Sequence, residues 1–307
     1  MAFLYALPGA IAEGLIWGLV AIGVYISYKI LDIADLTVDG SICTGACVCA
    51  VLLGLGVPAW AAMLIAFAAG TLTGIVTGLL HTVLGIPSIL AGILTQLMLY
   101  SVNLLILGGR SLVAIDSRSI DLLVNMSDKT GSILSAGIIV TITIVALWLF
   151  FYTEVGLTLK STGDNPDMSR AQGVDVKFNK VLGLAIANGI LAMAGALLAQ
   201  YKGSANINDG RGAIVIALAA IFIGLSVSMK IKPNFVVSLI GVIGGGIVYY
   251  IVYNFVILMG LKTDYLKMLS AVIVALFLGI PYLKAEYFTK QKAPQTAPQQ
   301  TGGNADA

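Results

Sequence analysis

Charged side chains are scarce in this sequence. Only 10% of the 307 residues are Asp, Glu, Lys or Arg, against about 25% in an ordinary soluble domain. Apolar residues make up 59%, and the mean hydropathy of the whole chain is +0.99, so the apolar excess is not confined to one anchor. We therefore exclude a water-soluble globule and predict an all-α polytopic membrane protein. The net charge of +2 gives no support for nucleic-acid binding.

Several sequence features that would indicate other classes of protein are also missing. Cys43, Cys47 and Cys49 are an odd number within one apolar segment, which argues against a disulfide framework. No nearby His or carboxylate completes a metal site with them, so we predict no metal. There is no Gly-x-x-x-x-Gly-Lys-Ser/Thr loop to bind ATP, and no buried relay of acids and His for a proton-driven pump. No Lys or Arg precedes Lys29, so we expect the first apolar run to remain as a helix.

Apolar runs long enough to cross the hydrocarbon core predict about nine transmembrane helices, within a range of eight to ten. They are Pro8–Tyr28, Ser41–Leu55, Ala59–Leu84, Ser88–Leu107, Gly131–Tyr152, Val181–Tyr201, Ala213–Met229, Phe235–Met259 and Met268–Leu283. The runs are continuous rather than alternating, which argues against a β-barrel. The second run is short and follows the polar stretch Asp32–Ser41, which indicates a broken or re-entrant helix near residues 32–45.

Lys and Arg in the short loops predict the orientation. The basic excess lies in three segments: residues 154–180, the pair Lys230 and Lys232, and the tail. Two predicted crossings separate each from the next, so all three fall on one side of the membrane. We therefore predict an outside N-terminus, a cytoplasmic C-terminus and a cytoplasmic loop over 154–180. The transmembrane domain takes residues 1–288. Residues 289–307 are rich in Gln, Pro, Thr, Ala and Gly, which indicates a disordered cytoplasmic tail.

Small and polar residues mark particular faces of the spans. Gly70, Gly74 and Gly78 repeat every four residues, which favours close helix packing within the chain or, alternatively, a dimer contact. Gln96 and Asn103 in the fourth span and Asn188 in the sixth are rare intramembrane amides. Such groups are costly and are candidates for lining a path. They also serve as hydrogen bonds between helices, so both interpretations remain open.

The cytoplasmic loop contains a short helix with clear boundaries. Asn165 is a good N-cap, Pro166 suits the first helical position, and Gly173 suits the left-handed residue past the end. Asp167 and Arg170 lie where the helix dipole favours them. Such a helix is either a connector or a docking element that receives force from a soluble partner.

Several blocks resemble one family. The segment GLIWGLVAIGVYISYKILDIADLTVDGSICTG resembles the first conserved block of ABC importer permeases of the branched-chain amino acid and ribose class, through Leu36, Asp39, Gly40 and Ser41. The loop LTLKSTGDNPDMSRAQGVDV is similar to the coupling motif of that family, and Gly163, Asn165 and Gly173 match it. A third block matches at Gly195, Gly212 and Gly224. The segments LTVDGS and GDNPDMSRAQGV resemble those of tryptophan/tyrosine-type permeases.

The resemblance implies a multi-pass permease in a bacterial plasma membrane that acts as an alternating-access subunit of an ATP-driven importer. It implies no enzyme activity and no cofactor in this chain, because ATP and Mg²⁺ belong to a separate ATPase. The implied partners are two ATPase copies, an extracytoplasmic binding protein and a second copy of this chain. We favour an aromatic or other amino acid as the solute.

The site residues expected on this basis fall into three groups. ATPase coupling is assigned to Lys160, Gly163, Asp164, Asn165, Pro166, Asp167, Arg170 and Gly173. The translocation path is assigned to Asp39, Gly40, Ser41, Gln96 and Asn103. Docking of the binding protein is assigned to Arg110, Arg118, Lys202 and Arg211. The rival hypothesis is an ATP-independent secondary transporter or channel. An intramembrane enzyme lacks a convergent nucleophile and base.

Overall fold

The computed structural model describes residues 2–116, 120–228 and 234–258, with single residues between 268 and 279. Almost all secondary structure in these ranges is helical. The elements are α1 (Ala2–Tyr25), the π-helical turn η1 (Ile26–Ile30), α2 (Val38–Gly54), α3 (Ala59–Thr82), α4 (Ser88–Ile106), β1 (Leu112–Ala114), α5 (Lys129–Phe151), α6 (Glu154–Asp164), α7 (Pro166–Ala171), α8 (Val176–Lys202), β2 (Ser204–Asn206), α9 (Ala213–Ser228) and α10 (Phe235–Leu258).

Six helices in the described ranges are long and apolar enough to cross a membrane. They are Ala6–Ile30, which joins α1 to the π-helical turn, and α3, α4, α5, α8 and α10. Two of the predicted crossings, α2 and α9, are shorter apolar helices. The ninth predicted run, Met268–Leu283, lies almost entirely outside the described residues, as do the predicted tail 289–307 and the pair Lys230 and Lys232.

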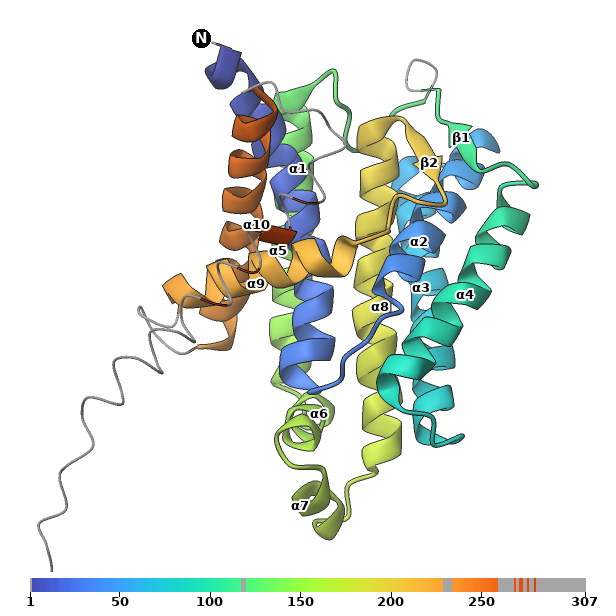
Figure 1. Cartoon of the computed structure of the whole chain (residues 1–307), viewed down its shortest axis with the longest axis vertical. Coiled ribbons are helices and arrows are strands. Elements are labelled where there is room, and N and C mark those ends of the chain that lie inside the picture. Colours follow the sequence, from blue (N-terminus) through green and yellow to red (C-terminus); the bar gives the residue numbers. More distant parts are fainter. Residues whose placement is uncertain are drawn as a thin grey trace, which may run out of the picture.

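The long helix α8 stands in the middle of the bundle (Figure 1). On one side lie α2, α3 and α4, and on the other α1, α5, α9 and α10, with α9 strongly tilted against α8. The strands β1 and β2 lie at one end of the bundle, and α6 and α7 project from the opposite end. The N-terminal part of α1 lies at the strand end, where the Tyr201 hydroxyl at the end of α8 donates to the Gly9 carbonyl at 3.3 Å. The N-terminal part of α1 and the helices α6 and α7 of the loop 154–180 thus lie at opposite ends of the bundle.

Small residues let the helices approach closely where lipid provides no hydrophobic drive for association. The stripe of Gly70, Gly74 and Gly78 on α3 lies against α8 of the same chain. A methyl group at Gly74 would come within 2.7 Å of the Ala185 Cα atom, and one at Gly78 within 2.8 Å of the Val181 Cα atom. The structure therefore uses this stripe for packing inside one chain.

Large apolar side chains cover the outside of the bundle. Leu72 on α3, Leu105 on α4, and Leu134 and Ile138 on α5 are all exposed, Leu105 at 79%. Soluble monomers rarely expose contiguous apolar surface on this scale. The distribution fits a bundle whose outer faces contact lipid.

The sequence predicts a broken or re-entrant helix near residues 32–45, and the structure instead has a non-helical break between the π-helical turn and α2. The π-helical turn ends at Ile30, the chain then passes through Asp32 with a φ of +55°, and α2 begins at Val38. The helix α2 then continues unbroken to Gly54. The discontinuity therefore covers residues 31–37, at the start of the range that the sequence indicated.

Candidate functional site

Two short helices form the end of the molecule opposite the strands. Asn165 lies between them: it ends α6, and its side-chain oxygen accepts a hydrogen bond from the Met168 backbone N–H at 3.0 Å to begin α7. Pro166 is the first residue of α7, and Gly173 follows the helix with a φ of +83°. The predicted helix and both of its boundaries are thus confirmed.

The sequence interpretation missed α6. Its N-terminus is marked by Thr153, whose hydroxyl accepts from the Gly156 N–H at 3.2 Å. That Thr, followed by Glu154 in the first turn, was the available signal. The loop is therefore a helical pair rather than one isolated helix.

The pair is fastened to the bundle at two points. Gly163 on α6 packs against the backbone of Ile30 in the π-helical turn so closely that a methyl group there would overlap the Ile30 carbonyl. Asn179 on α8 donates from Nδ2 to the Thr162 hydroxyl at 3.0 Å. The helical pair therefore contacts both the π-helical turn that follows α1 and the first turn of α8.

The remaining residues predicted for coupling lie on the surface of the pair. Lys160, Asp164 and Arg170 are exposed. The Arg170 guanidinium lies 3.5 Å from the Asp167 carboxylate, and both side chains are largely in solvent. An exposed pair of this kind adds little to stability, so these charges are available to a partner.

A cavity of about 270 Å³ lies between α2, α4 and the segment that leads into α9. It brings together Asp39, Gly40, Gln96 and Asn103, which are four of the five residues predicted for the path. Arg211, which the sequence interpretation assigned to docking, lines the same cavity. The cavity thus combines one acid, one base and two amides.

Asp39 also fixes the beginning of α9. Its carboxylate accepts hydrogen bonds from the Gly212 N–H at 2.8 Å and from the Ile214 N–H at 3.3 Å. A carboxylate at this place satisfies N–H groups that a helix leaves open and matches its positive end. The acid at the cavity is therefore tied to the next helix of the bundle.

Ser41, the fifth predicted path residue, faces away from the cavity into a buried polar network. Its hydroxyl donates to Asn188 Oδ1 at 2.6 Å and lies 2.7 Å from the Thr73 hydroxyl. Asn188 Nδ2 donates in turn to Asp35 Oδ2 at 2.7 Å, and Asp35 Oδ1 accepts from the Thr37 N–H at 2.8 Å. All five residues are buried. The sequence interpretation identified Asn188 as a polar intramembrane residue but did not connect it to Asp35.

The two loops predicted as a docking surface meet at the strand end. β1 and β2 pair antiparallel, with Leu112 opposite Asn206 and Ala114 opposite Ser204. Arg110 is exposed just before β1, and Arg118 lies outside the described residues.

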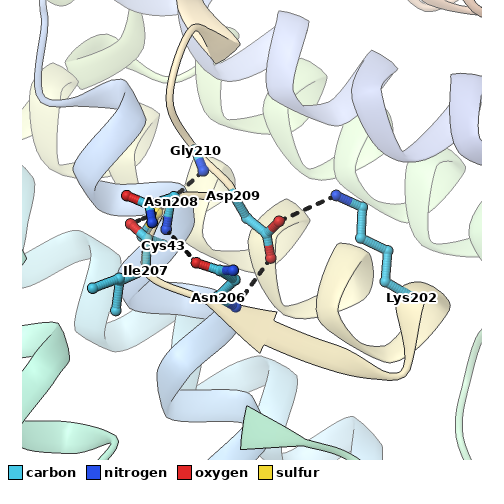
Figure 2. A network of polar contacts seen from close by, with 7 residues as sticks. All are labelled: Cys43, Lys202, Asn206, Ile207, Asn208, Asp209 and Gly210. Atoms are coloured by element: carbon cyan, nitrogen blue, oxygen red, sulfur yellow. Dashed lines mark hydrogen bonds and ion pairs between the residues drawn. The ribbon is translucent and has the colours of Figure 1, made fainter. Parts of the chain in front are cut away.

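The turn after β2 is held by a compact set of contacts (Figure 2). Lys202 lies 3.4 Å from the Asp209 carboxylate, which also accepts from the Asn206 N–H at 3.1 Å. The Cys43 thiol of α2 donates to the Ile207 carbonyl at 3.2 Å and accepts from the Gly210 N–H at 3.1 Å. The turn that carries Arg211 is therefore anchored on α2. No cluster of three or more potential metal ligands occurs among the described residues.

Comparison with known proteins gives a consistent result. Residues 8–280 match the family described as branched-chain amino acid transport system / permease component. The chain is 35% identical over 267 residues to a tyrosine transport system permease protein of Clostridioides difficile, covering 87% of this chain and 88% of that one. It is 23% identical to the ribose import permease protein of Escherichia coli, covering 79% and 75%. It is 28% identical to an autoinducer 2 import system permease protein of Salmonella paratyphi B, covering 61% and 55%. No solved structure matches the chain.

Proposed function

Because the chain belongs to the family of branched-chain amino acid transport system permease components, we propose that it is the membrane-spanning subunit of an ATP-driven importer. It takes a small solute from an extracytoplasmic binding protein and passes it inward by alternating access. It is a multi-pass protein of a bacterial plasma membrane and acts as a homodimer, because two ATPase copies each need a coupling surface. ATP and Mg²⁺ are bound by the ATPase and not by this chain.

The observation that carries this proposal is the helical pair α6 and α7. Beyond the bundle, Met168 on α7 is 60% exposed, and Phe178 at the start of α8 is also exposed. Large apolar side chains on a projecting surface are typical of a protein contact. Lys160, Asp164 and Arg170 in the same helical pair are also exposed, so we assign this end of the molecule to the ATPase. This assignment places the α6–α7 end in the cytoplasm and the strand end outside.

The mechanism follows from the way the pair is attached. Closure of the ATPase dimer moves α6, and the contact of Gly163 with Ile30 transmits that movement to the end of α1. The break at 31–37 lets α2 shift relative to α1 and alters the cavity beside Asp39. The binding protein docks on the strand end, where Arg110, Arg118, Lys202 and Arg211 supply positive charge.

We favour an amino acid as the solute, and an aromatic one in particular. The similarity to a tyrosine transport system permease supports this assignment. The combination of acid, base and amides in the cavity also suits an amino acid.

A single substitution tests the coupling assignment. We expect Gly173→Arg to abolish ATPase association and ATP-driven uptake, because the new side chain projects from the docking surface. Gly56→Arg is a matched control: Gly56 has a φ of +82° against +83° for Gly173, and both positions have open space around them. If Gly173→Arg keeps both association and uptake, the coupling assignment is wrong.

The alternative function is a secondary transporter or channel that needs no ATPase. It predicts solute uptake by this chain alone in vesicles with an ion gradient. The ATP-driven importer predicts uptake only when the ATPase, ATP and Mg²⁺ are present. The same vesicle preparation, with and without the ATPase, separates the two.

A further inference from the structure

The cavity between α2 and α4 contains a buried acceptor that lacks a donor. Asn103 is 1% exposed, and its Oδ1 atom has no hydrogen-bond partner among the described residues. Its side chain lines the cavity. A buried carbonyl oxygen without a partner costs free energy, so an N–H or O–H group that enters the cavity relieves that cost.

The same cavity presents one negative and one positive side chain. Asp39 is held by the Gly212 and Ile214 N–H groups, so its position on the cavity wall is fixed. Arg211 precedes Gly212 directly, so the base lies on the segment that the acid holds in place.

This pairing of charges discriminates between classes of solute. A neutral sugar brings no charge to match either side chain. A zwitterion brings one charge of each sign, and both need partners when they leave water. A site with Asp39 for an ammonium group and Arg211 for a carboxylate provides both, and the guanidinium is well suited to a carboxylate.

The other walls fit an apolar side chain of limited size. Leu97 and Tyr100 on α4 and Ile207 on the turn after β2 line the cavity. Its volume of about 270 Å³ lies just below the roughly 300–1,000 Å³ of drug-sized pockets. The space therefore suits a single small solute.

We propose that this cavity binds a zwitterionic amino acid whose side chain is an apolar ring that ends in an O–H or N–H donor. Asp39 accepts from its ammonium group, Arg211 donates to its carboxylate, and Asn103 Oδ1 accepts from the donor on the ring. The inference rests on the proposed function, because it assigns a solute class to the proposed path. It also ties the bound ammonium group to the N-terminus of α9 through Asp39.

Saturation-transfer NMR on the full chain in lipid nanodiscs tests the site, because this method detects weak binding. The probes are L-tyrosine, tyramine, which lacks the carboxylate, 3-(4-hydroxyphenyl)propionate, which lacks the amine, and L-phenylalanine, which lacks the hydroxyl. We expect L-tyrosine to bind, and loss of either charge to weaken binding by about tenfold or more. L-Phenylalanine should bind more weakly than L-tyrosine.

Variants assign each contact. Arg211→Gln should weaken L-tyrosine binding by about tenfold and leave tyramine binding unchanged, because tyramine has no carboxylate to lose. Asn103→Leu should remove the preference for L-tyrosine over L-phenylalanine. Lys177→Gln, which removes an exposed positive charge at the opposite end, is the control and should bind all four probes as the unchanged protein does.

Either of two results overturns the inference: no saturation transfer to L-tyrosine, or an Arg211→Gln variant that weakens tyramine and L-tyrosine equally. Neither measurement involves the ATPase. If the inference fails but the chain and the ATPase still take up another solute with ATP, the proposed function is intact. Conversely, ATP-independent uptake overturns the proposed function whatever the four probes show.

Discussion

Asn188, in the middle of α8, donates a hydrogen bond from Nδ2 to Asp35 Oδ2 at 2.7 Å and joins α8 to the break between α1 and α2. Asp35 is 3% exposed and Asn188 is fully buried. The second carboxylate oxygen of Asp35 accepts from the Thr37 N–H. The non-helical residues 31–37 are thus held in place by side-chain bonds that a continuous helix would not need.

Removing the amide of Asn188 should destabilise the fold. In Asn188→Leu, the Asp35 carboxylate loses a donor and Ser41 loses its acceptor, while both stay buried. We expect a loss of about 3 kcal/mol, since buried polar groups are left without hydrogen-bond partners. Thermal unfolding of the full chain in nanodiscs measures it. Thr141→Val is the control, because the exposed Thr141 hydroxyl bonds only within its own helix, to the Gly137 carbonyl; equal stability of the two variants would contradict the prediction.

The sequence was sufficient where the signal is local. Long apolar runs placed α3 and α5 within about two residues of their observed bounds, and Asn165, Pro166 and Gly173 defined α7. Apolar content and capping chemistry depend only on neighbours along the chain, so a single sequence carries them.

The sequence was insufficient where partners are far apart along the chain. Asp35 and Asn188 are separated by 153 positions, and nothing in their immediate neighbours relates them. Gln96 and Asn103 were chosen as intramembrane amides, and Asp39 and Ser41 as part of a discontinuous segment. Only the packing of α2 against α4 shows that Asp39 shares a cavity with the two amides while Ser41 does not. Arg211 joins that cavity because Asp39 and Cys43 anchor its segment on α2.

The backbone contact between α6 and the π-helical turn should be essential for coupling. Gly163→Val places a branched side chain against the Ile30 carbonyl and separates α6 from the end of α1. We expect ATP-driven uptake to be lost while the ATPase still binds, because α7 and its exposed surface are unchanged. Uptake and co-purification of the ATPase measure the two effects. A variant that loses both together would show that Gly163 supports the docking surface itself.

Close packing of α3 on α8 should tolerate no added side chain. Gly74→Val brings new atoms into the backbone of Leu184 and Ala185, which cannot move without shifting α8. We expect a loss of about 3 kcal/mol, at the upper end of overpacking costs. Gly137→Val on α5 is the matched control, since a Cβ atom there meets nothing within 4 Å. If the two glycine variants unfold at the same temperature in nanodiscs, the packing role of this stripe is refuted.

The pairing of β1 with β2 can be fixed covalently. Ala114 and Ser204 are direct partners in the two-stranded sheet, so cysteines at both positions lie within reach of a disulfide bond. We expect A114C/S204C to form that bond on mild oxidation, detected by mass spectrometry of the linked peptides. Leu112→Cys with Ser204→Cys is the control, because these positions are diagonal neighbours about 7–8 Å apart and exceed the reach of an unstrained bond.

If β1 and β2 move as one unit under the docked binding protein, ATP-driven uptake by the oxidised A114C/S204C variant should equal that of its reduced form. A loss of uptake that a reductant restores would instead show that the two strands separate during each transport cycle.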